Sequence, residues 1–531
     1  MKIAILVHNT IIGDARVRKE ARSLSDVGYD IDLFGYGDLT NAPNNLENCN
    51  LILVKKSPLI SWYRSAKNFV GKTDEVIEKL KVFGKELIAS QDNGQQTPYR
   101  YFFVYFSLLA LALAHLPQSF VNAQHTFLLC LATIIGTVLA VRSGWIGKSE
   151  FYLIGFFVQA SVWTLMPSAN YLLAIILVVL CVHLSIIVLN IIKNRLRILN
   201  RLQERFIIPK RYNHIASQIV KSVDVKKYDV IHAHDIIGLI AAVELKKKKP
   251  QVKIVWDAHE LYPELNNISS VSKEFMRRVI GRSSADIDYF ITINQSFIDY
   301  YRERFHRMPS GTILMNAARK EGSSIEKNGF LRSAAGISDD QFVLLFQGGL
   351  SADRGVEILL DAAEKIPEWW SIIFMGDGLL GEGVRKKIDE FQGRRPPGRE
   401  AIAMIPAAPY HDLASWTSGA DLGVIPYENV GLNHLYCTPN KLWEYPNAGI
   451  PILASNMIEM GKMIEEYETG ILLPTEFNSG DIVSALEAID RRQLSKLTKN
   501  CRKFSAVENW KKYEKRLIEL YKEIENSKIS P

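Results

Sequence analysis

Cysteine is scarce in this sequence of 531 residues, which contains only five. They lie far apart in the chain, at Cys49, Cys130, Cys181, Cys437 and Cys501. No two have the C-x-x-C spacing that is typical of zinc and redox sites. The sequence therefore excludes a small disulfide-stapled domain and predicts no structural zinc, which suits a reducing cytosol.

A strong net charge is also missing, because the formal charge is only +7 at neutral pH. Much of the excess of lysine and arginine lies beside a long apolar block, where anionic lipid headgroups would attract it. We interpret the charge as a membrane-surface feature rather than a nucleic-acid footprint, and we expect no nucleic-acid partner.

The apolar block runs from about Tyr99 to Ile192 and contains four apolar runs with almost no ionisable residue inside them. The segments before and after the block are rich in lysine and arginine, and Arg142 and Lys148 lie in its middle connection. The two other connections, 115–125 and 167–170, carry no Lys, Arg, Asp or Glu. This alternation predicts about four transmembrane helices with both flanks in the cytoplasm.

The first three runs are short of the about 20 residues that cross a bilayer upright. A buried helical hairpin, or two re-entrant pairs that enter one leaflet, is therefore an alternative to four full spans. The block is not a signal peptide, since it begins about a hundred residues into the chain.

Outside the block, strand-like and helix-like segments alternate in two series. The first opens with a strand at 2–7, a loop at 8–13 and a helical pattern from Asp14, and resumes after the block at about Tyr228. The second begins at about Ala317. The fold class is therefore α/β, with two Rossmann-like doubly wound domains and an inserted transmembrane block of about four helices.

Three loops of the second series have the residues that a nucleotide diphosphate requires: backbone N–H groups, a fixed cation and a ribose acceptor. QGGLSADRG, from Gln347, supplies glycines and Arg354, and MGDG, from Met375, is a second glycine turn. TPNKLWEYPNAGIP, from Thr438, supplies a cation and an acid at a helix start. Each signal is weak alone, and together they favour a donor site.

Histidines and acids follow two strands of the first series. His232 and His234 are two residues apart, so they point to one face of a strand, while Asp235 points to the other. WDAHE places Asp257, His259 and Glu260 at a strand end, where a general base or an acceptor-hydroxyl contact would belong, or simply a helix-capping loop. A metal pair is conceivable, but no Asp/Glu-x-Asp cluster marks a metal-dependent phosphate site.

These motifs carry a family resemblance. MKIAILVHNTIIGDARVRKEARSL, VIHAHD, WDAHELYPE, QGGLSADRGVEILLDAA, MGDG and CTPNKLWEYPNAGIPILAS make the sequence similar to retaining glycosyltransferases of family 4, which have the GT-B fold. The resemblance implies transfer of a sugar from a nucleotide-sugar of UDP or GDP type, with no cofactor and no metal.

The resemblance assigns residues to three groups. The catalytic residues are His234, Arg354 and Lys441. The donor-binding residues are Gly13, Gly348, Gly349, Arg354, Gly376, Gly378, Thr438, Asn440, Lys441 and Glu444. The acceptor-side residues are Asp14, His234, Asp235, His259 and Glu260.

Two positions depart from the family pattern. The family's Glu-x7-Glu motif would have an acid at Tyr436, and the arginine often found beside the first glycine of the phosphate loop is Gly349 here. These departures affect the expected sugar more than the reaction type. They also favour the rival hypothesis, a non-catalytic GT-B membrane scaffold that recruits partner transferases. A GT-B nucleotide-sugar epimerase is a further alternative, but it would need no bilayer anchor.

The predicted domain boundaries follow from the two series and the resemblance. They are 1–95 and 196–315 for the two parts of the N-terminal domain, the second including a basic amphipathic helix, 96–195 for the transmembrane insertion, 316–508 for the C-terminal nucleotide-sugar-binding domain and 509–531 for a C-terminal helix.

We expect an integral membrane protein with both soluble domains and both termini in the cytoplasm. The expected acceptor is a polyprenyl-diphosphate-linked sugar or another glycolipid, with other polysaccharide-assembly enzymes as partners.

Overall fold

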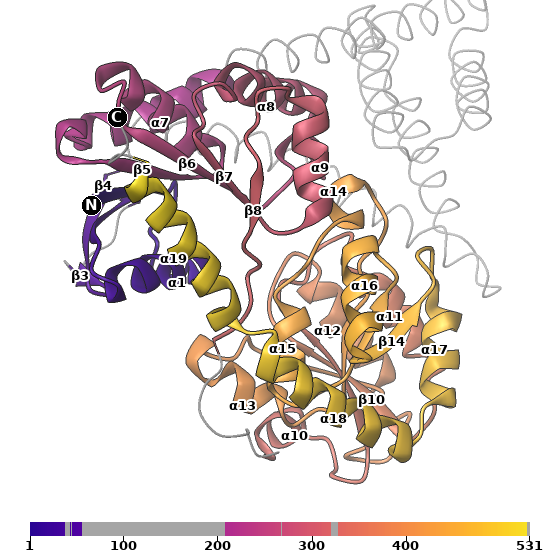
Figure 1. Ribbon diagram of the computed structural model, residues 1–531. Coiled ribbons are helices and arrows are strands. Elements are labelled where there is room, and N and C mark those ends of the chain that lie inside the picture. The colour runs from indigo at the N-terminus through magenta and orange to yellow at the C-terminus, as the bar shows by residue number, and fades with distance from the viewer. Residues whose placement is uncertain (38–42, 44, 56–207, 267, 320–327, 528–531) are drawn as a thin grey trace, which may run out of the picture. The chain divides into compact units, whose positions relative to one another are not determined.

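The computed structural model describes residues 1–37, 43, 45–55, 208–266, 268–319 and 328–527 (Figure 1). The apolar block at 99–192 lies outside the described residues, so its four predicted spans stay a prediction. Among the described residues, no helix combines the length and the apolar character that a bilayer crossing requires. Residues 1–55 and 207–531 belong to one structural unit, which holds two separate sheets.

The first sheet has eight strands in the order β3-β4-β2-β1-β5-β6-β7-β8. The strands are β1 (Lys2–Leu6), β2 (Asp30–Tyr36), β3 (Asn45–Leu46), β4 (Cys49–Val54), β5 (Val230–His234), β6 (Lys253–Ala258), β7 (Tyr289–Thr292) and β8 (Gly311–Ile313). All pairs are parallel except β3 with β4. The central strands are almost entirely buried and mostly apolar, as expected for a sheet covered by helices on both faces, and β5 also carries two buried histidines.

The helices of this first domain follow its strands. They are α1 (Ala15–Asp26), α7 (Asp235–Lys248), α8 (Ser270–Ser283) and α9 (Gln295–Arg304), with short 3-10 turns η2 (Val225–Lys227) and η3 (Tyr262–Glu264). Residues 208–222 are also helical. The lysine run at the end of α7 has the charge that a helix carboxyl end favours.

The second sheet has six parallel strands in the order β11-β10-β9-β12-β13-β14. The strands are β9 (Phe342–Gln347), β10 (Trp370–Met375), β11 (Ile402–Ile405), β12 (Leu422–Ile425), β13 (Ile452–Ser455) and β14 (Gly470–Leu473). The helices are α10 (Phe330–Ala335), α11 (Val356–Ala362), α12 (Gly381–Phe391), η4 (Tyr410–Asp412), α13 (Leu413–Thr417), α14 (Leu432–Leu435), α15 (Lys441–Asn447), α16 (Ile458–Tyr467), α17 (Ser479–Ala488) and α18 (Arg491–Val507). The predicted two parallel α/β series are therefore confirmed.

The last helix, α19 (Trp510–Asn526), follows the second domain in sequence but packs against α1 of the first (Figure 1). The Trp510 indole N–H donates to Ser23 Oγ at 2.8 Å, and the Tyr521 hydroxyl lies 2.8 Å from His232 Nδ1. The buried face of α19, which includes Trp510, Leu517 and Tyr521, completes the packing of the first domain.

Candidate active site

Two glycine loops lie side by side at the carboxyl edge of the second sheet, after β9 and β10. The backbone N–H of Gly348 donates to Met375 O, and that of Leu350 donates to Asp377 O, both at 2.9 Å. A Cβ atom on Gly376 would lie 2.0 Å from Gly348 O. Glycine is therefore required where these two loops meet, and the loops are held as one surface.

Two cations converge on this surface. Lys441 Nζ lies 5.7 Å and the Arg354 guanidinium 5.6 Å from the ring centroid of Tyr427. A Cβ atom on Gly348 would be 3.1 Å from Lys441 Nζ, and one on Gly349 would be 3.7 Å from an Arg354 nitrogen. The structure thus brings together both predicted cations and both predicted glycines, an arrangement that suits a diphosphate.

Helix α15 also carries Glu444, which lies at the end of β9. The Gln347 amide donates to Glu444 Oε2 at 2.8 Å, and Gln347 Oε1 in turn accepts from Thr417 at 2.8 Å. The hydroxyl of Thr438 is buried and has no hydrogen-bond partner. Gln347 therefore fixes the Glu444 carboxylate. Thr438, in the segment that leads into α15, has a hydroxyl that no hydrogen bond to the protein occupies.

The remaining predicted donor residues have different surroundings. Gly378 is needed because a Cβ there would lie 2.2 Å from Leu350 O, whereas Gly13 faces open space. Asn440 is exposed, and its Oδ1 accepts from Asn316 Nδ2 at 2.8 Å.

In the first domain, Asp14 caps α1. Its carboxylate accepts from the backbone N–H of Val17 at 3.1 Å and from the Asn9 amide at 2.9 Å. Both bonds belong to the helix start and its loop. The structure therefore shows Asp14 as the N-cap of α1, and its acceptor-side role stays a prediction.

A fully buried ionic cluster lies beneath the carboxyl ends of β5 and β6. Arg16 donates from Nε and Nη2 to the two oxygens of Asp257, at 2.6 and 2.9 Å. Glu20 Oε2 lies 3.5 Å from His232 Nε2 and 3.7 Å from His234 Nε2. The two imidazole rings stack with centroids 4.6 Å apart, as their spacing on one face of β5 predicts. In this structure His234 is completely buried and presents no exposed nitrogen.

The cluster shifts the pKa values of its members in opposite directions. Burial alone would lower the pKa of His234, but the bond to Asp257 and the charge of Glu20 raise it to about 9. Burial lowers the pKa of His232 well below its usual range, with the charge of His234 adding to the effect. Burial opposes ionisation of Asp257, but Arg16 and His234 hold its pKa well below the usual range. His234 is thus the charged histidine and His232 the neutral one.

Four members of the cluster are of metal-ligating type, with ligand atoms within 4.8 Å of one another: Glu20, His232, His234 and Asp257. A metal ion bound along the lone pairs of both rings would have to lie in both ring planes. The stacked planes are only 7° from parallel, and Arg16 already occupies both oxygens of Asp257. The residues therefore fit a proton-sharing ionic cluster better than a metal site.

Asp235 is not part of β5, where strand alternation was expected to orient it, but is the first residue of α7. Its φ is 61°, an uncommon conformation for a residue other than glycine. Its carboxylate lies 3.0 Å from His8 Nδ1 and 3.3 Å from His259 Nε2, and it accepts a short hydrogen bond from the Tyr262 hydroxyl. Burial would raise the pKa of Asp235, but His259 and His8 hold it well below the usual range.

Glu260 connects the first domain to the second. Its Oε2 accepts from the Asn433 amide at 2.7 Å, and the backbone N–H of Leu261 donates to Asn433 Oδ1 at 2.8 Å. Asn294 donates to the backbone oxygen of Tyr436 at 2.7 Å. The segment where the family pattern would place a glutamate is therefore anchored to the first domain.

Sequence reasoning did not identify four residues of these networks: His8, Arg16, Glu20 and Asn433. Arg16 and Asp257 are 241 residues apart, and Leu261 and Asn433 are 172 apart, so no local pattern joins them. A usable signal for Arg16 and Glu20 was their spacing of four, which puts them on one face of α1.

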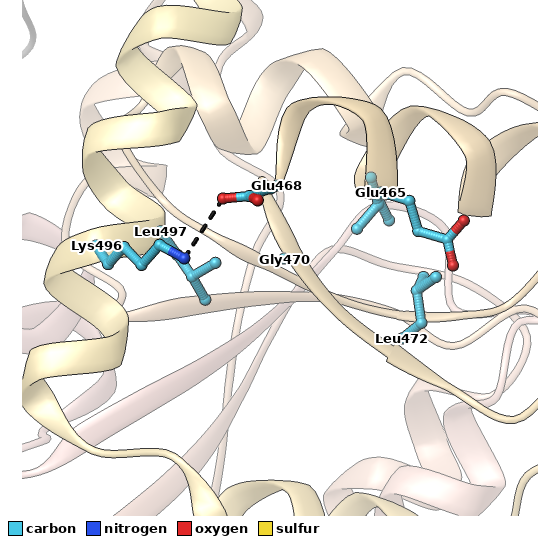
Figure 2. A pocket seen from close by; sticks show the side chains of 7 residues that line it. Glu465, Glu468, Gly470, Leu472, Lys496 and Leu497 are labelled. Atoms are coloured by element: carbon cyan, nitrogen blue, oxygen red, sulfur yellow. Dashed lines mark ion pairs between the residues drawn. The ribbon is translucent and has the colours of Figure 1, made fainter.

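A surface pocket of about 350 Å³ lies elsewhere, beside the edge strand β14 (Figure 2). Its lining includes Ile464, Glu465, Leu472 and Leu497, and Lys496 pairs with Glu468 at 3.4 Å. None of the predicted site residues lines it.

Comparisons with known proteins find glycosyltransferases among the similar sequences and structures. Residues 341–490 match the family model of the glycosyl transferases of group 1. The chain is 25% identical to an alpha-D-kanosaminyltransferase of Streptomyces kanamyceticus over 192 residues, which are 35% of this chain and 45% of that protein. It is 22% identical to a D-inositol 3-phosphate glycosyltransferase of Xylanimonas cellulosilytica over 221 residues, 41% of this chain and 51% of that one. The chain spans about half the length of these curated relatives.

Solved structures share the fold. Sucrose-phosphate synthase from Thermosynechococcus elongatus aligns with a TM-score of 0.57 at 12% identity, covering 99% of this chain and 100% of that one. HepE of Anabaena, solved in complex with UDP-glucose, aligns with a TM-score of 0.55 at 11% identity, covering 98% and 100%. Residues 341–490 are therefore similar to the glycosyl transferases of group 1, and the chain shares the GT-B-like α/β fold of these solved structures.

Proposed function

We propose that the protein is a membrane-bound retaining glycosyltransferase of family 4. It moves a sugar from a nucleotide-diphosphate donor of UDP or GDP type to a lipid-linked acceptor at the cytoplasmic face. The observation that carries the donor half is the convergence of Arg354 and Lys441 on Gly348 and Gly349.

In this proposal the diphosphate lies against the paired glycine loops. Arg354 and Lys441 stabilise the negative charge that develops on it as the sugar leaves. Glu444, fixed by Gln347, accepts the ribose hydroxyl hydrogen bonds. With Tyr436 in place of an acid, backbone groups of 437–440 contact the donor sugar.

The acceptor half rests on the first domain and on the apolar block. Asp235, His259 and Glu260 lie at the carboxyl edge of the first sheet, where ligands of open α/β sheets bind. His234, charged and fully buried, acts from the ionic cluster behind that edge. The apolar block and its basic flanks are the sequence feature that supports a membrane-held acceptor, such as a polyprenyl-diphosphate-linked sugar or another glycolipid.

Thermal unfolding of the detergent-purified protein tests the donor site. UDP, GDP and their sugar conjugates are compared on wild type, Glu444→Ala and the control Glu487→Ala, an exposed acid on α17. A ligand at about 100 times its Kd should stabilise wild type and control by about 2.7 kcal/mol. The same ligand should not stabilise Glu444→Ala. If no nucleotide shifts the folded wild type, the non-catalytic scaffold becomes the better hypothesis.

The membrane half has a separate test. Wild type should remain in the membrane fraction after alkaline carbonate washing. A variant in which residues 56–206 are replaced by a Gly/Ser linker should move to the supernatant and still bind the nucleotide. Release of wild type by carbonate would contradict the integral anchor without affecting the donor site.

A further inference from the structure

Lys19, on α1, is a lysine whose charged group is buried. The residue is only 8% exposed, and its Nζ donates to Asn316 Oδ1 and to Ala317 O, both at 2.6 Å. Nζ also lies 4.9 Å from the ring centroid of Trp510. A buried ammonium group is costly unless it is hydrogen-bonded, and each of these three partners comes from a segment outside α1.

The partners of Lys19 lie on the two segments that connect the domains. Residues 314–319 follow β8 and lead toward the second domain, and residues 508–509 join α18 to α19. The two segments are bonded to each other, because the backbone N–H of Trp510 donates to Ala318 O at 3.0 Å. Lys19 therefore lies where both connections meet.

Asn316 continues this contact to the helix that carries the donor residues. Its amide nitrogen donates to Asn440 Oδ1 at 2.8 Å. The backbone oxygen of Asn440 accepts from the N–H groups of Trp443 and Glu444, at 2.9 and 3.0 Å, so Asn440 closes the first turn of α15. One end of the Asn316 amide is thus bound by Lys19 and the other by the start of α15.

We propose that Lys19 and Asn316 are positioning residues of the donor site. The Lys19 ammonium orients the Asn316 amide, and that amide holds the first turn of α15. Lys441 and Glu444 then meet the nucleotide from a fixed helix, and neither positioning residue touches the donor. This inference rests on the proposed function, because it requires a nucleotide-sugar at α15.

The charges around Lys19 make this link sensitive to pH. Burial lowers the pKa of Lys19 to about 7, and the positive charges of Arg16 and Arg319 add to the effect. The negative charges of Glu20 and Glu444 oppose it. The group of α19 that faces the ammonium is an uncharged indole ring. Lys19 therefore changes its charge near neutral pH.

Donor binding should favour the charged form of Lys19. A nucleotide diphosphate brings further negative charge to α15, where Glu444 already raises the pKa of Lys19. By linkage, the protein should then take up a proton as it binds the donor. Below about pH 7 Lys19 is charged in both the free and the bound protein, so affinity is constant, whereas above that pH the free protein loses the proton first and affinity falls.

Calorimetric titration of the full-length protein in detergent tests the link. UDP-glucose and GDP-mannose are the probes, because their diphosphate groups do not titrate near neutral pH. The variants are Lys19→Met, which keeps most of the apolar stem without the charge, Asn316→Ala, and the control Lys511→Met, an exposed lysine on α19.

Below the pKa of Lys19, we expect the donor Kd to rise by about tenfold in Lys19→Met and by about three- to tenfold in Asn316→Ala. The control should match wild type. As the pH rises above about 7, the wild-type Kd should increase and the difference from Lys19→Met should narrow. A purely structural role of Lys19 would give a difference that does not change with pH.

Two results would overturn the inference and leave the donor site intact: a wild-type Kd that is constant across this pH range, or a Kd of Lys19→Met that follows the wild-type profile. Donor binding by Asn316→Ala at the wild-type affinity would also overturn it, and this variant decides the matter even if Lys19→Met does not fold. If folded wild type binds neither donor, the proposed function fails and this inference fails with it.

Discussion

Arg16 shows how one side chain can hold together a buried set of charges. It is 4% exposed, bonds both oxygens of Asp257, and lies 3.1 Å from Glu20. Burial would lower its pKa, but the charges of Asp257 and Glu20 raise it. The guanidinium therefore stays charged and balances the Asp257 carboxylate beneath the carboxyl ends of β5 and β6.

Replacing Arg16 should leave uncompensated buried charge. For Arg16→Met we expect a loss of about 3–5 kcal/mol in the free energy of unfolding. The control is Arg22→Ala on the same helix, where the side chain is 49% exposed and its ion pairs are 3.7 Å long. That variant should stay within about 0.5 kcal/mol of wild type in urea unfolding. Equal losses in both variants would show that the cluster is not what Arg16 stabilises.

For individual residues, the sequence predicted which residue types form the site better than it predicted which residues they contact. The i, i+2 spacing predicted that His232 and His234 share a face, and the structure confirms it, whereas Asp235 lies beyond the strand at the start of α7. It could not show that Asp235 binds His8, because strand pairing sets which loops meet. It also could not show that His234 is fully buried, since burial depends on the return of α19.

Elements were easier to predict than contacts. The residues of β9 and β10 were evident from buried, largely apolar runs before glycine turns, because a parallel strand covered on both faces has no polar alternation. The short strand β3 and the anchoring of α14 have no periodic signal, so they were not predicted. The elements that carry the donor site were the ones with the strongest patterns.

The two glycine loops give a prediction about elements. For Gly376→Ala, the new Cβ would overlap Gly348 O, so the loops should separate and donor affinity should fall by at least tenfold. Gly383→Ala is the matched control, because nothing lies within 4 Å of its Cβ position and it is inside α12. Gly383→Ala should raise the free energy of unfolding by up to about 1 kcal/mol and leave the donor affinity unchanged. Calorimetric titration with whichever nucleotide stabilises wild type in thermal unfolding measures both affinities, and normal affinity in Gly376→Ala would contradict the loop geometry.

For the whole molecule, the prediction concerns the contact that Asn433 makes between the second domain and the first. Its amide satisfies the backbone N–H of Leu261 and the carboxylate of Glu260. Asn433→Ala leaves both without this partner, which should cost about 1–3 kcal/mol. We expect a lower free energy of unfolding and faster trypsin cleavage between the domains.

The control for that change is Asn429→Ala, whose exposed side chain bonds Glu476 within the second domain. It should leave both measurements unchanged. If Asn433→Ala behaves the same way, the contact does not hold the domains together.

The return of α19 to α1 also fixes an order of events during synthesis. Trp510 and Ser23 are separated by 487 residues, so at about 5–20 residues per second the ribosome needs about 25 to 100 s to supply the partner of a helix that emerged first. Throughout that interval the face of α1 that Trp510 and Tyr521 will cover stays open. The N-terminal domain is therefore translated first but is the last to complete its core, and a nascent chain stalled before residue 510 would carry that face uncovered.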